Sequence, residues 1–287
     1  ACEILELLNN YKNSHLPKLS SLITGDFSTS KTSTIALTML NNATSLLQNI
    51  ASKSLNMIPE VLNRVQERGF NKDAGVHTVT TDVVKAMCNV DEVMEDIREV
   101  VKNRKGSNRY RWQSGDDESE PGEDYKEYLV VMLVSKLERM GEELSKWWGE
   151  GGEAVKGLWM VNNVFYMQSH FTESEKGVGW WKDMCEGLIR KNREKYERGT
   201  WAVIRENLTD VDKGKFKYQA GGKLLTLECG RLLKSRFGGF AESLESIHSR
   251  HRHLSIPNEV VREEFRNKGV EVVVERYKEF WKEYGNV

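Results

Sequence analysis

Residues 270–284 read VEVVVERYKEFWKEY, and their apolar side chains recur with the spacing of a helix. The residues that share one predicted face are Val270, Val273, Val274, Tyr277, Trp281 and Tyr284. The same rhythm occurs in residues 37–50, 83–101 and 129–144. Apolar helix faces are buried against neighbouring helices. The chain is therefore predicted to be all-α, an elongated rod of stacked antiparallel helical bundles.

Composition supports this class and limits the partners. Charged residues make up 30% of the 287 residues and only 4 are proline, so helix formers dominate and helix breakers are rare. Lys and Arg number 42 against 43 Asp and Glu, so no net field concentrates the chain on nucleic acid or on an anionic membrane. A helical nucleic-acid binder, which needs clustered Lys and Arg, is disfavoured.

Cysteine spacing and apolar run length indicate the cellular setting. The four cysteines, at positions 2, 88, 185 and 229, have no metal-ligand spacing, which argues against a disulfide framework or a zinc module and fits a reducing, cytoplasmic setting. The longest apolar run, Tyr128 to Val134, is far shorter than the ~20 residues that cross a bilayer. Because the helical pattern begins directly after Ala1, without Met, we expect an internal fragment whose native N-terminus is missing.

One segment departs from the helical pattern. Residues 113–124 read QSGDDESEPGED, which is acidic and almost devoid of apolar side chains. Such a composition cannot bury enough apolar surface to fold, so a flexible loop is predicted. This loop separates a first helical bundle, residues 1–112, from the C-terminal helical bundles, residues 125–287.

The nearest approach to a nucleotide site is residues 25–32, which read GDFSTSKT. This differs by one residue from the phosphate-binding pattern GxxxxGK[ST]. Ser30 replaces the second glycine, whose backbone must come close to phosphate, and no buried strand precedes the segment. We therefore predict a loop that leads into a helix. The alternative is a nucleotide-dependent enzyme with a degenerate phosphate loop from Gly25 to Thr32.

Neither metal binding nor catalysis has support in the sequence. His248, His251 and His253 form a cluster, but Arg250 and Arg252 lie between them and would repel a cation. The carboxylates lie in mixed-charge patterns suited to exposed helix surfaces, and there is no nucleophile elbow. The chain is predicted to have no enzymatic activity, no metal and no cofactor.

Aromatic residues suggest a binding surface. The chain from Tyr125 onward holds seven of the eight tryptophans, more aromatic bulk than narrow helix faces readily bury. Some of these side chains should line an apolar groove that takes up a short hydrophobic segment of another protein. Burial of all of them in the bundle ends is the alternative. The candidate groove residues are Trp159, Phe165, Trp180, Trp181 and Phe240.

Several segments carry a resemblance to a known family. Gly75-Val-His77-Thr-Val-Thr80 looks like a Gly-Val-His-Pro-Leu-Thr segment that opens a helix, with Thr78 in place of Pro. Asn162-Asn163 lies in a helix similar to one with an Asn-Asn pair, and Tyr196, Arg198 and Trp201 match a Tyr-x-Arg-x-x-Trp step. Near the end come Ile256-Pro257-Asn258 and Tyr277-Lys278-Glu279-Phe280. In this order the segments resemble the seventy-kilodalton exocyst subunit family in its plant form, over nearly the whole chain.

The resemblance carries functional implications. It implies a stacked helical rod from the C-terminal half of a subunit that tethers secretory vesicles to the plasma membrane and has no catalytic activity. The other exocyst subunits would be partners where the N-terminal helices that join them are present. The plant members also suggest a role in immunity, as partner or target of a pathogen protein. The expected location is the cytoplasm, peripheral at the plasma membrane.

The family also binds phosphatidylinositol bisphosphate through basic residues near its C-terminus. The residues of this chain that would make that contact are Arg266, Lys268, Arg276, Lys278 and Lys282. Acidic residues alternate with them along the sequence from position 263 to 283. Attraction to an anionic surface, about 1 kcal/mol per basic residue, is therefore largely offset, and only weak binding to anionic lipid is predicted.

Overall fold

The computed structural model describes Lys18, Ser21 and residues 31–88, 121–171, 178–209, 217–219, 222–224 and 227–284. Its long helices are α3 (Lys31–Arg64), α5 (Pro121–Trp148), α6 (Gly152–Phe171), α7 (Val178–Asn207) and α8 (Leu227–His251). At the C-terminal end, α9 (Glu259–Val270) continues through a π-helical turn, η2 (Glu271–Glu275), into α10 (Arg276–Tyr284). Strands β1 (Lys217–Gln219) and β2 (Gly222–Leu224) pair as a short antiparallel hairpin. The prediction of an all-α fold is confirmed.

The described residues divide into two compact units. Unit 1 comprises residues 1–69, 77–139 and 166–184, and unit 2 comprises residues 70–76, 140–165 and 185–287. The predicted acidic loop lies largely outside the described residues, but its last four residues open α5, which begins at Pro121. Proline suits the first turn of a helix because it has no N–H to leave unpaired.

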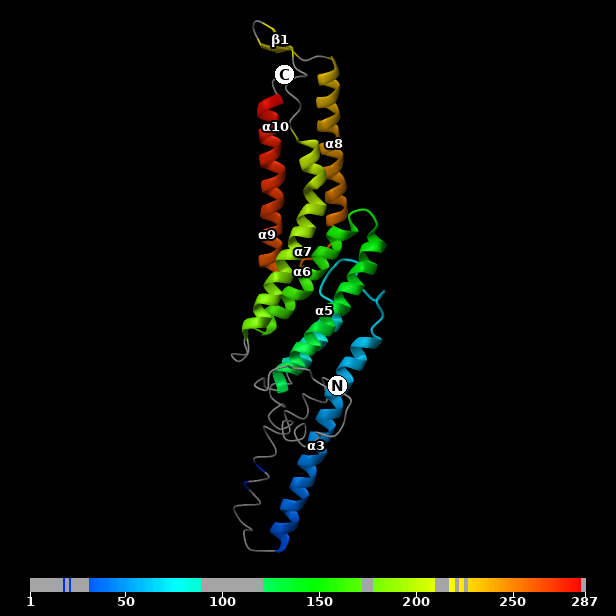
Figure 1. Ribbon diagram of the computed structural model, residues 1–287, viewed down its shortest axis with the longest axis vertical. Helices are drawn as coiled ribbons and strands as arrows, with labels where there is room; N and C mark the ends of the chain where they lie inside the picture. The colour runs from blue at the N-terminus through cyan, green and yellow to red at the C-terminus, as the bar shows by residue number, and fades with distance from the viewer. Residues whose placement is uncertain are drawn as a thin grey trace. The chain divides into compact units, whose positions relative to one another are not determined.

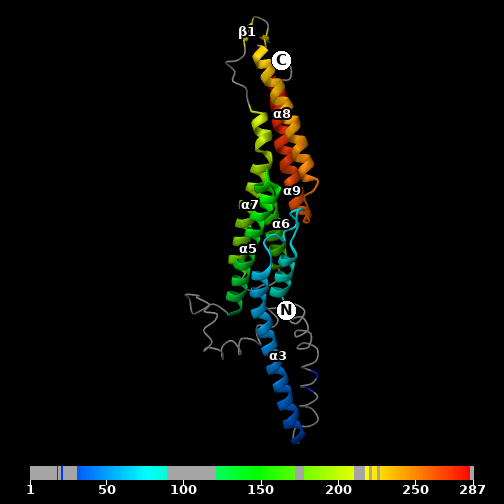
Figure 2. The same ribbon diagram turned by 90° about the vertical axis from the view of Figure 1, so that its right-hand side faces the viewer.

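In unit 1 the described helical segments bury apolar side chains. The segment 78–88 lies beside the C-terminal end of α3 (Figure 2). Its start is fixed by His77, whose Nδ1 accepts a hydrogen bond from the Val79 amide at 3.1 Å and whose Nε2 donates to the Gly69 carbonyl at 2.8 Å. Val83 and Met87 are buried, as their spacing predicted. The remainder of that stripe, from position 90 to 101, lies outside the described residues.

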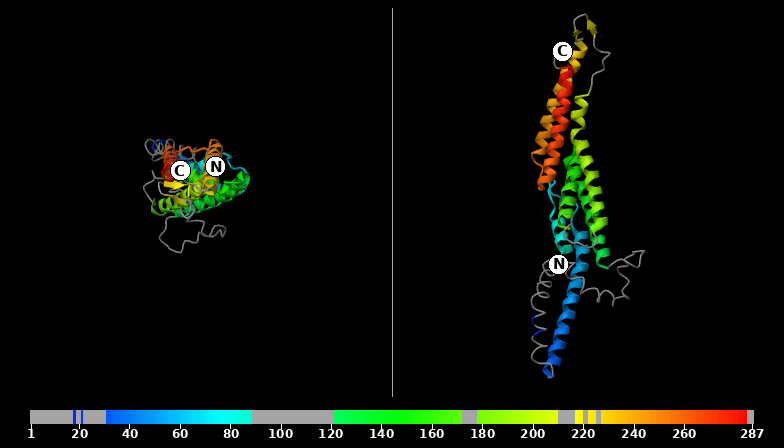
Figure 3. Two further views of the ribbon diagram at one scale, coloured as in Figure 1. Left: turned by 90° about the horizontal axis from the view of Figure 1, so that it is seen from above. Right: turned by 90° about the vertical axis from the view of Figure 1, so that its left-hand side faces the viewer.

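In unit 2, α8 lies alongside α9, η2 and α10 (Figures 1 and 3). Its core is a cluster of buried side chains from α7, α8 and the C-terminal helices: Trp201, Ile204, Leu208, Cys229, Leu233, Ile247, Val272, Phe280 and Tyr284. Helix α9 begins with a side-chain cap, because Asn258 Oδ1 accepts a hydrogen bond from the Val261 amide at 3.1 Å. Between α5 and α6 the chain turns at glycines: Gly149 and Gly151 adopt positive φ angles of 66° and 77°.

The stripe predicted from Val270 to Tyr284 is only partly correct. Tyr284 is buried, but Val270 and Trp281 are 54% and 50% exposed, while Val272 and Phe280 are buried instead. A π-helical turn accommodates an additional residue, so side chains beyond it, such as Phe280 and Trp281, lie on a different face from the one that a 3.6-residue repeat predicts, whereas Val270 precedes the turn. Val260 is also exposed, unlike its neighbour Val261, which is buried.

Candidate functional site

The Asn162-Asn163 pair of α6 joins three segments of unit 2 that are far apart in the sequence. Asn162 Nδ2 donates to the carbonyls of Ala74 at 2.7 Å and Ser255 at 2.9 Å. Asn163 Nδ2 donates to the carbonyls of Gly75 at 3.5 Å and Trp159 at 2.9 Å. Both asparagines are buried. Buried amides that satisfy loop carbonyls hold those loops in one conformation, so this pair has a structural role.

The two loops that meet at α6 also bond to each other. The Ser255 amide donates to the Asp73 carbonyl at 2.7 Å. Asp73 Oδ1 accepts from the Gly75 amide at 3.0 Å, and the intervening Ala74 adopts a φ of 57°. Three of the family-like segments, around Gly75, Asn162 and Ile256, therefore converge here. We call this contact the joint at Asn162 and Asn163.

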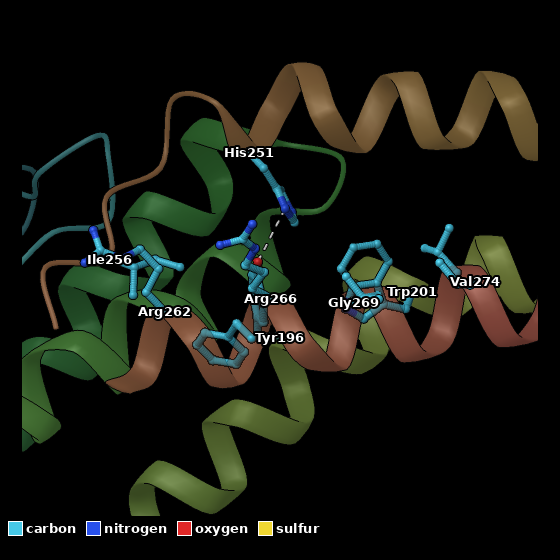
Figure 4. Close-up of a pocket in the computed structure, with 11 residues that line it drawn as sticks. Tyr196, Trp201, His251, Ile256, Arg262, Arg266, Gly269 and Val274 are labelled. Atoms are coloured by element: carbon cyan, nitrogen blue, oxygen red, sulfur yellow. Dashed lines mark hydrogen bonds between the residues drawn. The ribbon is translucent and has the colours of Figure 1, made fainter. Parts of the chain in front are cut away.

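A pocket of about 510 Å³ opens beside Ile256, in the loop between α8 and α9 (Figure 4). Its floor comes from three aromatic rings. His251 at the end of α8 stacks on Tyr196 of α7, with ring centroids 5.7 Å apart and planes inclined by 24°. Trp201 meets the His251 ring edge-on at 6.0 Å. Aromatic contacts of this kind hold the floor in place.

The floor is uncharged at neutral pH. Burial, together with Arg250 and His248, lowers the pKa of His251 to about 4. Burial also raises the pKa of the Tyr196 hydroxyl well above its usual range. Tyr196 Oη and His251 Nδ1 lie 3.4 Å apart. Both side chains thus present neutral polar atoms rather than charges.

One wall of the pocket is the continuous helical stretch from α9 into η2. Gly269 lets this wall approach the floor closely, because a Cβ atom there would lie 2.8 Å from Cζ2 of Trp201. Val273 and Val274, within the π-helical turn, both line the pocket. Phe265 contributes a ring that packs on Tyr196 at 4.5 Å. The wall is thus almost entirely apolar.

The rim carries the charge of the site. Arg262 and Arg266 line the pocket one turn apart, near Ile256 of the preceding loop (Figure 4). Arg266 forms an ion pair with Glu263 at 3.5 Å, between two largely exposed side chains. An exposed pair of this length contributes little, so Arg266 can exchange partners. No carboxylate is among the residues that line the pocket.

The predicted groove residues are not brought together here. Trp159 is 0% exposed, with its ring against Gly141, because α6 is enclosed by its neighbours; it cannot line a surface groove. Phe165 and Phe240 are half-buried, and Phe240 stacks on Tyr277 at 5.5 Å. Trp181, in unit 1, is buried, and the side chain of Trp180 lies outside the described residues. Tyr196 and Trp201 entered the sequence analysis as parts of a family-like segment and Arg262 did not, since no spacing rule marks residues from different helices as neighbours.

The predicted lipid-contact residues lie on α9 and α10. Lys268 bonds Glu271 at 2.8 Å, and this hydrogen bond raises the lysine pKa. Arg276 pairs with Glu279 at 3.1 Å. Lys278 and Lys282 are exposed on α10. Acidic and basic side chains are therefore neighbours on the helix surface as well as along the sequence.

The remaining candidates from the sequence are the degenerate phosphate loop and the clustered histidines. Gly25 to Ser30 lie outside the described residues, and Lys31 opens α3. Of the three clustered histidines, His251 is half-buried, whereas His248 and His253 are exposed. Across the part of the chain that the structure describes, no group of His, Cys, Asp or Glu is arranged to hold a metal ion. Nor does any helix within those residues have the length and apolar character needed to span a membrane.

Comparison with known proteins gives consistent matches. A family model described as the C-terminal part of the Exo70 exocyst complex subunit matches residues 3–287. Exocyst complex component EXO70I of Medicago truncatula is 28% identical over 172 residues, which cover 58% of this chain and 24% of that protein. Exocyst complex component EXO70A1 of Arabidopsis thaliana is 27% identical over 141 residues, which cover 46% of this chain and 21% of that protein. The chain thus matches less than a quarter of the length of these curated relatives.

Proposed function

Because the chain belongs to the Exo70 exocyst subunit family, we propose that it is the C-terminal part of a protein that tethers secretory vesicles at the plasma membrane. The observation that carries this proposal is the match of the family model to residues 3–287. In this role the chain acts by binding other proteins, the remaining exocyst subunits among them, and has no catalytic activity. The family model also covers Gly25 to Thr32, so we propose no nucleotide-dependent activity for this segment.

The joint at Asn162 and Asn163 supports a role as a rigid adaptor. An adaptor transmits force or position between its partners only if its helices keep a fixed arrangement. Four side-chain hydrogen bonds to loop and helix carbonyls provide such an arrangement within unit 2.

Membrane association is proposed to be peripheral and weak. The ion pairs of Lys268 with Glu271 and of Arg276 with Glu279 place carboxylates beside the basic groups that would face anionic headgroups. Each carboxylate offsets part of the attraction of its partner. Recruitment to the membrane then depends on protein partners, with lipid contact as a minor contribution.

A role in plant immunity is the finer part of the proposal. It rests on the resemblance to plant members of the family, where a pathogen protein could engage the chain as partner or target. The expected contact is a short hydrophobic segment of that protein.

The proposal is tested in plant cells that lack the native protein. A secreted fluorescent reporter should accumulate inside these cells, and the full-length gene should restore its export. Affinity capture of the tagged full-length protein should recover other exocyst subunits. Normal export in the deficient cells, together with capture of no exocyst subunit, would refute the tethering role.

A further inference from the structure

The pocket of unit 2 is a preformed depression with an apolar wall. Val273 and Val274 line it from the π-helical turn, and Phe265 lines it from α9. Its geometry is fixed by close packing, because Gly269 brings the wall against the Trp201 ring. A pocket of about 510 Å³ is of the size that proteins use for small ligands or for inserted side chains.

Apolar side chains continue from this pocket over the solvent-exposed face of the C-terminal helices. Val270 and Val274, both in the wall, are 54% and 39% exposed. Beyond them Trp281 is half exposed and stacks on Tyr277, with ring centroids 6.0 Å apart. Exposed valines and aromatic rings in a continuous row are typical of surfaces that receive another chain.

Charge restricts the occupant. The lining residues carry two positive charges, Arg262 and Arg266, and no carboxylate. The neutral His251 adds none at pH 7, because its pKa is about 4. Glu264 of α9 pairs with Arg193 rather than with a pocket residue, and Glu263 pairs only loosely with Arg266, at 3.5 Å. A ligand carboxylate can therefore bind the two guanidinium groups, which suit carboxylates by their planar, forked geometry.

The floor of the pocket also holds an unsatisfied donor. Nε1 of Trp201 is buried and has no acceptor among the described residues. A buried N–H without a partner is destabilising, and native structures rarely retain one without reason. Trp201 belongs to the pocket floor, but its Nε1 is itself enclosed, so a ligand acceptor would reach it only after the ring moved.

We propose that this pocket binds a short peptide segment of a partner protein in which a large apolar side chain lies next to an Asp or Glu. The apolar side chain enters between Trp201 and the valines of η2, and the carboxylate bonds Arg262 and Arg266 at the rim. A peptide is favoured over an anionic membrane because Glu263, Glu271 and Glu279 on the same helices would approach the headgroups. The inference rests on the proposed function only in taking the ligand to be a protein.

The test is selection of random 16-residue peptides, displayed on phage, against the intact chain. Enriched peptides should carry Leu, Ile, Phe or Trp within three residues of Asp or Glu. Their synthetic forms should bind with micromolar Kd in fluorescence anisotropy. The double variant Arg262→Glu/Arg266→Glu and the single variant Val274→Asp should each weaken binding at least tenfold.

A matched control separates the pocket from general charge. Arg231→Glu/Lys234→Glu makes the same change in net charge on exposed positions of α8, outside the pocket, and should leave Kd within about twofold. Thermal unfolding of every variant shows that the fold is retained. Enrichment of no peptide, enrichment of basic peptides, or binding that survives both pocket variants would overturn the proposal. A membrane would be the occupant instead if no peptide were enriched, the unmodified chain bound vesicles with 5% phosphatidylinositol bisphosphate, and the pocket variants did not bind them. That result would also overturn the proposal.

These results are independent of the secretion assay. If peptides bind as described while secretion does not depend on the protein, the pocket stands and the tethering role fails. If no peptide is enriched while secretion depends on the protein, the tethering role stands and the pocket assignment fails.

Discussion

Two helical regions of unit 2 use apolar residues in opposite ways. In α6 every residue from Ala154 to Val164 is buried, including Lys156, whose ammonium group pairs with Glu142 of α5. That contact lowers the pKa of the Glu142 carboxyl. In the stretch from α9 to α10, one face packs in the core through Val272 and Phe280 while another leaves apolar side chains in solvent. The first region can only stabilise the fold, whereas the second is also free to bind.

The largest expected difference between the regions concerns one tryptophan from each. Trp159→Ala should lower the free energy of unfolding by about 3–5 kcal/mol, because it leaves a cavity in the enclosed α6. Trp281→Ala should lower it by about 1 kcal/mol or less, since half of that ring already contacts solvent. Urea unfolding measures both. Equal losses would show that the exposed row is part of the core.

The next effect is a pH dependence located at His251. Its folded pKa of about 4 lies below the unfolded value of 6.5, so the unfolded state takes up the proton first as pH falls. The corresponding stability is fully present above pH 6.5 and is lost towards pH 4, amounting to at most about 3 kcal/mol. His251→Phe should flatten this part of the stability profile relative to wild type. A profile of unchanged slope in the variant would mean that His251 is hydrated in solution.

Loss of the joint should have a somewhat smaller effect. Asn162→Ala removes two hydrogen bonds and leaves the Ala74 and Ser255 carbonyls without that donor, which should cost about 2–3 kcal/mol. Asn267→Ala, at an exposed position of α9, is the matched control and should change stability by less than about 0.5 kcal/mol. Amide exchange should increase in residues 71–76 only in the first variant. Similar values for the two variants would argue against a structural role of the pair.

The smallest effect concerns the surface ion pairs. Glu271→Gln and Glu279→Gln should each change stability by less than about 1 kcal/mol, because exposed pairs contribute little. Together they should increase sedimentation with anionic vesicles several-fold by unmasking Lys268 and Arg276. The increase should vanish in high salt. Strong vesicle binding by the unmodified chain would show that its carboxylates do not offset its basic groups.

Sequence reasoning succeeded where one helix face determines the outcome. The spacing of Val83 and Met87 predicted their burial. It failed where the backbone leaves the ideal repeat or where distant elements meet. The π-helical turn lies before Trp281, whose ring is half exposed, and the aromatic residues chosen for a groove include Trp159, which is fully enclosed. The predicted rod shape stays a prediction, and small-angle scattering would test it.

By itself the sequence determined the helical class, the balance of charge and the family to which the chain belongs, because periodicity, composition and short ordered segments are local properties of the chain. Only the tertiary structure decided that Asn162 and Asn163 bond two distant loops, and that Tyr196, Trp201, His251 and Arg262 surround one pocket. The physical reason is that a helix presents several faces of comparable apolar character. Which of them is buried depends on neighbours that lie far away in sequence, and here on one π-helical turn.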